Sequence, residues 1–126
     1  MTTDVMEEIM NRTDRIVTMI DPNVHILIEQ ANEKKNHGEL SRALQIYDEA
    51  LKIDPVCAGA LCLKGDVLDV MGRLEDAVSC YDSALESDPC NAEIWYNKGI
   101  TLKKMGKKSE ADTCMQNALS LAVGKR

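Results

Sequence analysis

The middle of the chain contains two runs of apolar and small residues that recur every three or four positions, the spacing of one face of an α-helix. The first run comprises Leu61, Gly65, Leu68 and Met71. Gly72 separates it from a second run, which comprises Leu74, Ala77, Val78, Tyr81, Ala84 and Leu85. Glycine can close a helix in the left-handed conformation, and the proline of Asp88-Pro89 cannot continue one. The pattern therefore predicts two helices joined by a short turn.

This two-helix pattern occurs three times with a period of 34 residues. A shift of one period aligns a glycine, two alanines and a leucine in every unit. The aligned sets are Gly38, Gly72 and Gly106; Ala43, Ala77 and Ala111; Ala50, Ala84 and Ala118; and Leu51, Leu85 and Leu119. Coincidences of this kind at one shift are the signature of stacked repeats. The sequence predicts three helix-turn-helix units, residues 24–57, 58–91 and 92–125.

The two ends of this array have patterns of their own. Residues 1–23 contain a predicted amphipathic N-terminal helix, whose apolar face comprises Met6, Ile9, Met10, Thr13, Ile16, Val17 and Ile20. That helix is either a degenerate second helix that caps the array, or a surface for a partner helix or a second copy of the chain. After the last helix no polar capping helix follows. An apolar end face usually finds cover by self-association, so we expect a homodimer.

The repeated residues resemble the tetratricopeptide repeat, which has large, small and aromatic residues at fixed places. The second unit matches in Leu61, Gly65, Ala77, Tyr81, Ala84 and Pro89, and the third in Trp95, Gly99, Ala111 and Ala118. The first unit departs most, with Ala31 in place of the small glycine and Lys34 in place of a leucine. The resemblance implies that residues 24–126 form an all-α, right-handed superhelix, or α-solenoid. Its concave groove would hold short peptides or helices of partner proteins.

The resemblance also implies which side chains line the groove, since these come mainly from the first helix of each unit. Apolar residues there offer anchoring surface, and asparagine amides can hydrogen-bond a peptide backbone. The predicted groove residues are Ile28, Asn32, Cys62, Leu63, Asp66, Glu93, Tyr96, Asn97 and Ile100. Some of them could instead pack against neighbouring helices or face solvent.

One subgroup of the family grips the terminal carboxylate of chaperone tails with a clamp of Lys, Asn, Asn, Lys and Arg. Only Asn32 matches that clamp here. The other places hold Ile28, Leu63, Glu93 and Asn97, and the carboxylate of Glu93 would repel a peptide carboxylate. The sequence therefore disfavours binding of chaperone tails.

Charge and hydropathy narrow the classes of partner. The formal net charge is −6, which disfavours general binding of nucleic acid, because such proteins concentrate Lys and Arg against phosphates. The run Lys103, Lys104, Lys107 and Lys108 is interpreted as a solvated basic turn in preference to a site for an acidic partner. Neither a signal-peptide pattern nor a membrane-spanning run is present, so we expect a cytoplasmic protein without a membrane partner.

The five cysteines form no CxxC pair, so they are interpreted as free thiols. A metal set of Cys57, Cys62, Cys90 and a histidine is disfavoured, because a full repeat separates Cys57 from Cys90. We expect no cofactor. No nucleophile motif or phosphate-binding loop occurs, so an enzyme is not expected.

The sequence thus favours an adaptor or scaffold that binds a protein or peptide in the concave groove. The alternative is a structural module that self-assembles through the N-terminal helix or the uncapped C-terminal helix. A metal or redox protein that uses the cysteines is a third, distant possibility.

Overall fold

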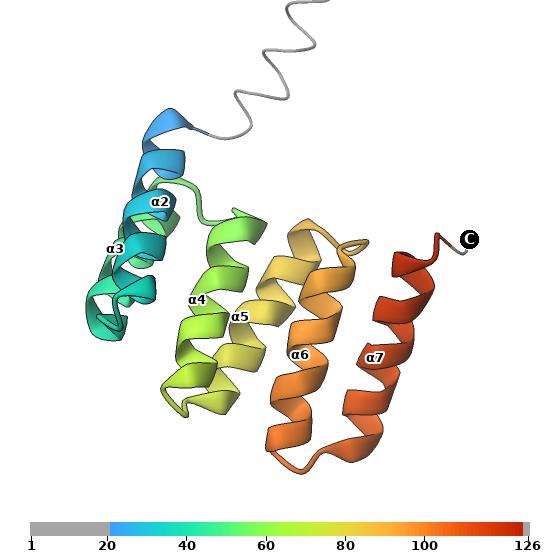
Figure 1. Ribbon diagram of the computed structural model, residues 1–126. Helices are drawn as coiled ribbons and strands as arrows, with labels where there is room; N and C mark the ends of the chain where they lie inside the picture. The colour runs from blue at the N-terminus through green and yellow to red at the C-terminus, as the bar shows by residue number, and fades with distance from the viewer. Residues whose placement is uncertain (1–20, 125–126) are drawn as a thin grey trace, which may run out of the picture.

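The structure is a computed structural model that describes residues 21–124. This part of the chain consists of α-helices joined by short turns, and its elements are α2 (Pro22–Asn36), α3 (Leu40–Ile53), α4 (Ala58–Val70), α5 (Leu74–Ser87), α6 (Ala92–Lys104) and α7 (Lys108–Ala122). They form antiparallel pairs set side by side in one row, with α2 at one end and α7 at the other (Figure 1). The predicted N-terminal helix lies outside the described residues.

The turn within each pair has the same construction in all three repeats. Gly38, Gly72 and Gly106 have φ angles of 80°, 83° and 81°, in the left-handed region where a Cβ is strained. The backbone amide that follows each glycine reaches back to the last helical turn: Arg73 N–H, for example, donates to the Leu68 carbonyl at 2.9 Å. This arrangement satisfies carbonyl groups that the helix end would otherwise leave unpaired. The prediction that Gly72 ends the first helix is confirmed.

Close packing within each pair depends on small residues. A Cβ added to Gly65 would lie 2.7 Å from Cε1 of Tyr81, and one added to Gly99 would lie 3.0 Å from Cε of Met115. Ala77 and Ala111, on the opposing helices, are buried. The glycines thus make room for a large side chain from the second helix. Met71 is an exception to the predicted apolar stripe, because it follows the end of α4 and is partly exposed.

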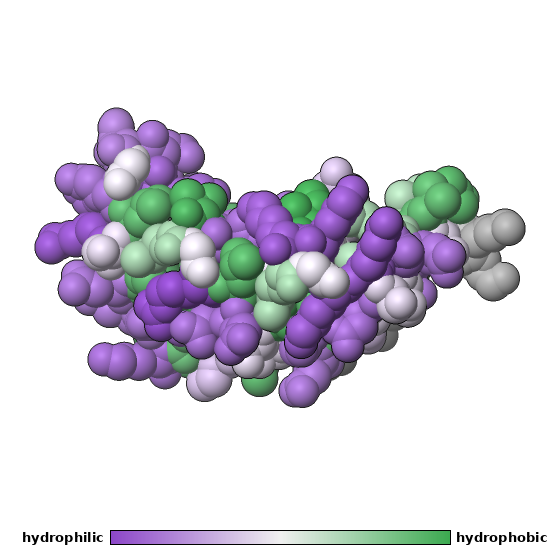
Figure 2. Space-filling model, turned by 90° about the horizontal axis from the view of Figure 1, so that it is seen from below, coloured by the Kyte–Doolittle hydropathy of each residue, from purple (hydrophilic) through white to green (hydrophobic). Residues whose placement is uncertain are grey.

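Contacts between repeats are made by neighbouring helices. Besides the pairs themselves, α3 packs on α4 and α5 packs on α6. The first helices also touch one another, α2 with α4 and α4 with α6, which places them on the inner side of the curved row. On the face seen from below, hydrophilic side chains predominate and hydrophobic ones form separate patches among them (Figure 2). None of the helices between residues 21 and 124 is long and apolar enough to span a lipid bilayer.

Candidate functional site

An ion pair of the same kind ties each repeat to the next. Lys64 Nζ lies 2.7 Å from Oδ1 of Asp48, and Lys98 Nζ lies 2.6 Å from Oδ1 of Asp82. The two pairs are one period apart, and each joins the second helix of one repeat to the first helix of the following repeat. Lys98 also lies 5.7 Å from the centroid of the Trp95 ring, within the range of a cation–π contact.

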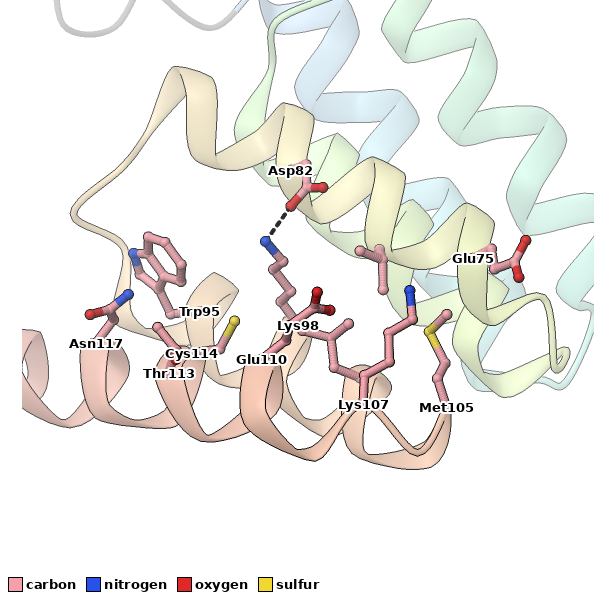
Figure 3. Close-up of a pocket in the computed structure, with 12 residues that line it drawn as sticks. Glu75, Asp82, Trp95, Lys98, Met105, Lys107, Glu110, Thr113, Cys114 and Asn117 are labelled. Carbon is pink, nitrogen blue, oxygen red and sulfur yellow. Dashed lines mark ion pairs between the residues drawn. The ribbon is translucent and has the colours of Figure 1, made fainter.

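These ion pairs lie in two hollows that we call the outer hollows. The larger is about 560 Å³, and its lining includes Asp82, Trp95, Lys98 and Cys114 (Figure 3). The smaller is about 300 Å³, and its lining includes Asp48, Lys64 and Cys80. The smaller hollow is the larger one displaced by one repeat, since its lining positions recur 34 residues later. We therefore interpret both as a by-product of repeat stacking.

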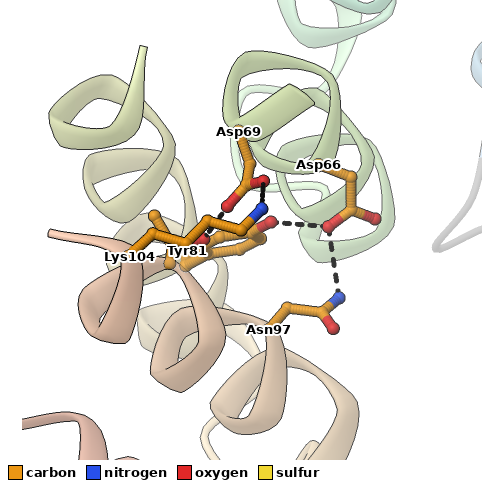
Figure 4. A network of polar contacts seen from close by, with 6 residues as sticks. Asp66, Asp69, Tyr81, Asn97 and Lys104 are labelled. Carbon is orange, nitrogen blue, oxygen red and sulfur yellow. Dashed lines mark hydrogen bonds and ion pairs between the residues drawn. The ribbon is translucent and has the colours of Figure 1, made fainter. Parts of the chain in front are cut away.

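The inner side of the second junction, between α4 and α6, carries a different set of polar contacts. Tyr81 O–H donates to Oδ1 of Asp66 at 2.6 Å, and Asn97 Nδ2 donates to the same oxygen at 3.2 Å (Figure 4). Asn97 Nδ2 also lies 3.7 Å from Sγ of Cys62. The Asp66 carboxylate is thus fixed in place by donors from α5 and α6.

A second carboxylate lies one helical turn further along α4. Asp69 accepts hydrogen bonds from the Thr101 hydroxyl and from the Lys104 ammonium group (Figure 4). Asp69 is therefore neutralised, and Lys104 is not simply a solvated member of the basic turn. Among residues 21–124, by contrast, Asp66 forms no ion pair.

Burial affects the acidity of this cluster. It raises the pKa of the Asp66 carboxyl above its ordinary value, an effect that the Tyr81 hydrogen bond partly opposes. Burial likewise raises the pKa of the Cys62 thiol to about 12, with the charge of Asp66 adding to the effect. Cys62 is consequently a protonated, unreactive thiol at neutral pH.

The first junction, between α2 and α4, has a less polar inner side. Tyr47 O–H donates to Oδ1 of Asn32, a neutral amide at the position that Asp66 holds one repeat later. Leu63 stands where Asn97 stands in the second junction, and it packs on the buried cluster that contains Ala31 and Tyr47. This junction therefore presents no carboxylate at the position equivalent to Asp66.

We call the concave surface along α2, α4 and α6 the inner groove. A hollow of about 200 Å³ in this groove is lined by three of the predicted groove residues and by three others: Asp66, Asn97 and Ile100, with Asp69, Val70 and Tyr81. Asp69, Val70 and Tyr81 are absent from the predicted list of groove residues. Tyr81 could have been found, because it lies one turn after Ala77 on the face of α5 that packs against Gly65 of α4.

The remaining predicted groove residues are dispersed. Asn32 is engaged by Tyr47, and Ile28 packs against the same cluster as Leu63. Cys62 is only 7% exposed and belongs to the core. Glu93 is exposed and Tyr96 is 51% exposed, and both line a separate apolar hollow at the α7 end of the row.

No group of three or more histidine, cysteine, aspartate or glutamate side chains in the described part is arranged to hold a metal ion. The cysteines are free thiols, and Cys62 and Cys114 are buried. Burial also raises the pKa of the Cys80 and Cys114 thiols.

Comparisons with known proteins agree with this architecture. The TPR repeat family matches residues 65–106, and the Tetratricopeptide repeat family matches residues 92–122. No curated protein is significantly similar to this chain in sequence. The fold itself defines a helical repeat protein with an inner groove. The family matches show tetratricopeptide repeats in residues 65–106 and 92–122, and this repeat is generally a non-catalytic fold that mediates protein interactions.

Several solved structures share the fold. The second TPR of Spaghetti (RPAP3), solved bound to the HSP90 peptide SRMEEVD, is 18% identical over 79% of this chain and 93% of that chain, with a TM-score of 0.77. The Sgt2 TPR domain from Aspergillus fumigatus is 21% identical over 82% of this chain and 68% of that chain, with a TM-score of 0.79. The Yersinia enterocolitica type III secretion translocator chaperone SycD (alternative dimer) is 17% identical over 85% of this chain and 81% of that chain, also at 0.79. The predicted all-α superhelix of helix pairs is confirmed.

Proposed function

We propose that this protein is an adaptor that binds a peptide or helix of a partner protein along the inner groove, without catalysis. The observation that carries the proposal is the Asp66 carboxylate, which lines the hollow of the inner groove and is held by Tyr81 and Asn97. Tyr81 and Asn97 satisfy Oδ1, and no hydrogen bond to Oδ2 is present within residues 21–124. A Lys or Arg side chain of a partner could bind this remaining oxygen, and little rearrangement would be needed because the carboxylate is already held in place.

The charge of the groove indicates the kind of peptide. Asp66 lies beside the neutralised Asp69, and Glu93 adds negative charge nearby. Ile100 and Val70 supply apolar walls to the same hollow. We therefore expect a peptide with a Lys or Arg side chain flanked by apolar residues. A chaperone-tail peptide such as SRMEEVD, which the Spaghetti domain was solved with, would bring like charges together.

The test is an array of acetylated and amidated peptides in which each position is varied among Lys, Glu and Leu. The wild-type protein is expected to retain Lys-containing peptides, and Asp66→Asn is expected to lose that preference. Asp112→Asn is the matched control, because it removes the same charge from an exposed position on α7.

Two further variants locate the binding surface. Asn97→Ala and Ile100→Ala should each weaken binding of the selected peptide, because both residues line the inner-groove hollow, with folding checked by circular dichroism. Equal binding of acidic and basic peptides by the wild type, or an unchanged preference in Asp66→Asn, would contradict the proposed role of the groove.

The alternative, a module that self-assembles, is favoured by one observation of its own. Leu119 and Val123 are exposed apolar residues at the α7 end of the row. Figure 2 shows hydrophobic side chains gathered at the end of the molecule that carries the carboxyl terminus. The two functions use different surfaces and can coexist.

A further inference from the structure

The apolar hollow at the α7 end, which we call the end hollow, has a volume of about 450 Å³. It is lined by Ala92, Glu93, Tyr96, Met115, Ala118, Leu119 and Ala122. One period earlier, the corresponding positions are Ala58, Gly59, Cys62, Tyr81, Ala84, Leu85 and Asp88. Most of that earlier set belongs to a core cluster completed by Ile94, a residue of the following repeat that is 1% exposed. The end hollow is therefore the place in which a further repeat would insert its own equivalent of Ile94.

The opposite end of the row carries a side chain of the matching kind. The positions equivalent to Ile94 are Ala60 in α4 and Ile26 in α2. Ala60 is fully buried, whereas Ile26 is 50% exposed. The row thus has a half-exposed apolar side chain at its α2 end, and at its α7 end an apolar hollow at the repeat-equivalent position.

The polar residues beside Ile26 and the end hollow would allow the two ends to meet as neighbouring repeats do within the row. Within the row, Lys64 pairs with Asp48 and Lys98 pairs with Asp82. The corresponding end positions are Gln30 on α2 and Gln116 on α7. Two glutamine amides can donate to and accept from each other, so the end faces would meet without charge repulsion.

We propose that copies of this chain associate head to tail, with α2 of one copy seated on α6 and α7 of another and Ile26 filling the end hollow. The contact continues the internal repeat–repeat interface across two molecules. Because each copy uses a different surface at each end, the contact is heterologous and extends into an open array, or a ring if the rotation closes. This geometry differs from the homodimer expected from the sequence, and it does not depend on the inner groove.

The test is sedimentation velocity and light scattering of the full chain over a range of concentrations. Wild-type mass should rise past that of two chains. The Ile26→Asp variant and the Leu119→Asp variant, each measured by itself, should be monomeric, since each substitution puts a charge into the apolar contact. Both replaced residues are exposed, at 50% and 64%, so both variants should fold, as circular dichroism will show.

A mixture of the two variants gives the decisive result. Ile26→Asp retains an intact end hollow and Leu119→Asp retains an intact Ile26, so the mixture should form a complex of one copy of each and grow no further. A symmetric dimer through α7 would be lost in Leu119→Asp and would not be recovered by mixing, which would overturn the proposal.

A double variant tests whether the contact between copies has the register of the internal repeat–repeat interface. The doubly substituted chain Gln30→Lys, Gln116→Asp places the internal ion pair at the new junction, so it should associate more tightly than the wild type and lose the gain in high salt.

Two other outcomes would overturn the proposal. If Ile16→Asp abolishes association and Ile26→Asp leaves it intact, the end hollow is assigned to residues 4–20 and not to α2. A wild-type protein that stays monomeric at the highest concentration would overturn it as well.

Discussion

The two junctions between repeats share their outer side and differ on their inner side. On the outside, each junction has a lysine–aspartate pair with nearly the same N–O distance, 2.7 and 2.6 Å. On the inside, the first junction pairs Tyr47 with the neutral Asn32, whereas the second pairs Tyr81 with the carboxylate of Asp66. The outer contacts therefore recur from one junction to the next, whereas the inner contacts differ in charge.

The largest expected effect comes from the small residue beneath the tyrosine. Gly65→Ala brings a methyl group against the buried Tyr81 ring and disturbs its bond to Asp66. We expect a loss of about 1–2 kcal/mol in the free energy of unfolding, after about 1 kcal/mol of gain in helix propensity. Urea denaturation measures the change.

Gly99→Ala is the matched control in the third repeat. Its new methyl group meets the flexible end of Met115, which can move, and lies 3.3 Å from the Ala111 carbonyl oxygen. This tight contact should offset the gain of about 1 kcal/mol in helix propensity, so the stability should stay close to that of the wild type. Equal losses in the two variants would show that the Tyr81 ring is not the rigid obstacle.

The next prediction compares how much the hydroxyl groups of Tyr81 and Tyr47 contribute to stability. Tyr81→Phe removes a donor to a carboxylate, and Tyr47→Phe removes a donor to an amide. Hydrogen bonds to charged groups contribute more, so we expect losses of about 1.5 kcal/mol and about 0.5–1 kcal/mol respectively. Thermal unfolding of both variants gives the order, and the reverse order would remove the distinction between the junctions.

A smaller effect appears in the pH dependence of stability. The folded pKa of Asp66 is raised above 3.8 by burial, so its contribution to stability is complete at low pH and is lost as the pH rises through the raised pKa. Asp66→Asn turns the second junction into the type found at the first, with an amide that still accepts from Tyr81. The variant should gain stability relative to the wild type as the pH increases from about 3.5 to about 7. A difference that is constant across this range would contradict the assignment.

The smallest effect is expected on the outer side. Lys64→Met and Lys98→Met each remove one ion pair whose aspartate is about half exposed. Such pairs contribute at most about 0.5–1 kcal/mol, and the two losses should agree with each other. A much greater loss for Lys98→Met would show that its contact with Trp95 matters more than the ion pair.

The sequence predicted the architecture well, because repeated glycines, alanines and Asp-Pro pairs carry direct backbone and packing meaning. It predicted the groove less completely. Aligning equivalent positions compares Asp66 with Asn32 and Ile100, but the contacts that build the site join non-equivalent positions, such as Asp66 with Asn97. Cys62 shows the same limit: its helical position suggested the groove, while the covering helix α6 places it in the core.

The neighbour-to-neighbour packing of the row has a consequence for how the molecule opens. Within residues 21–124, α4 and α5 contact a neighbouring repeat on both sides, whereas the α2–α3 and α6–α7 pairs contact one on a single side, so local unfolding of this row should begin at its ends and reach the middle last. In amide hydrogen exchange, α4 and α5 should protect their protons longest. Association of copies through these ends would slow amide hydrogen exchange first in α2 and α7, so exchange at those helices would report assembly.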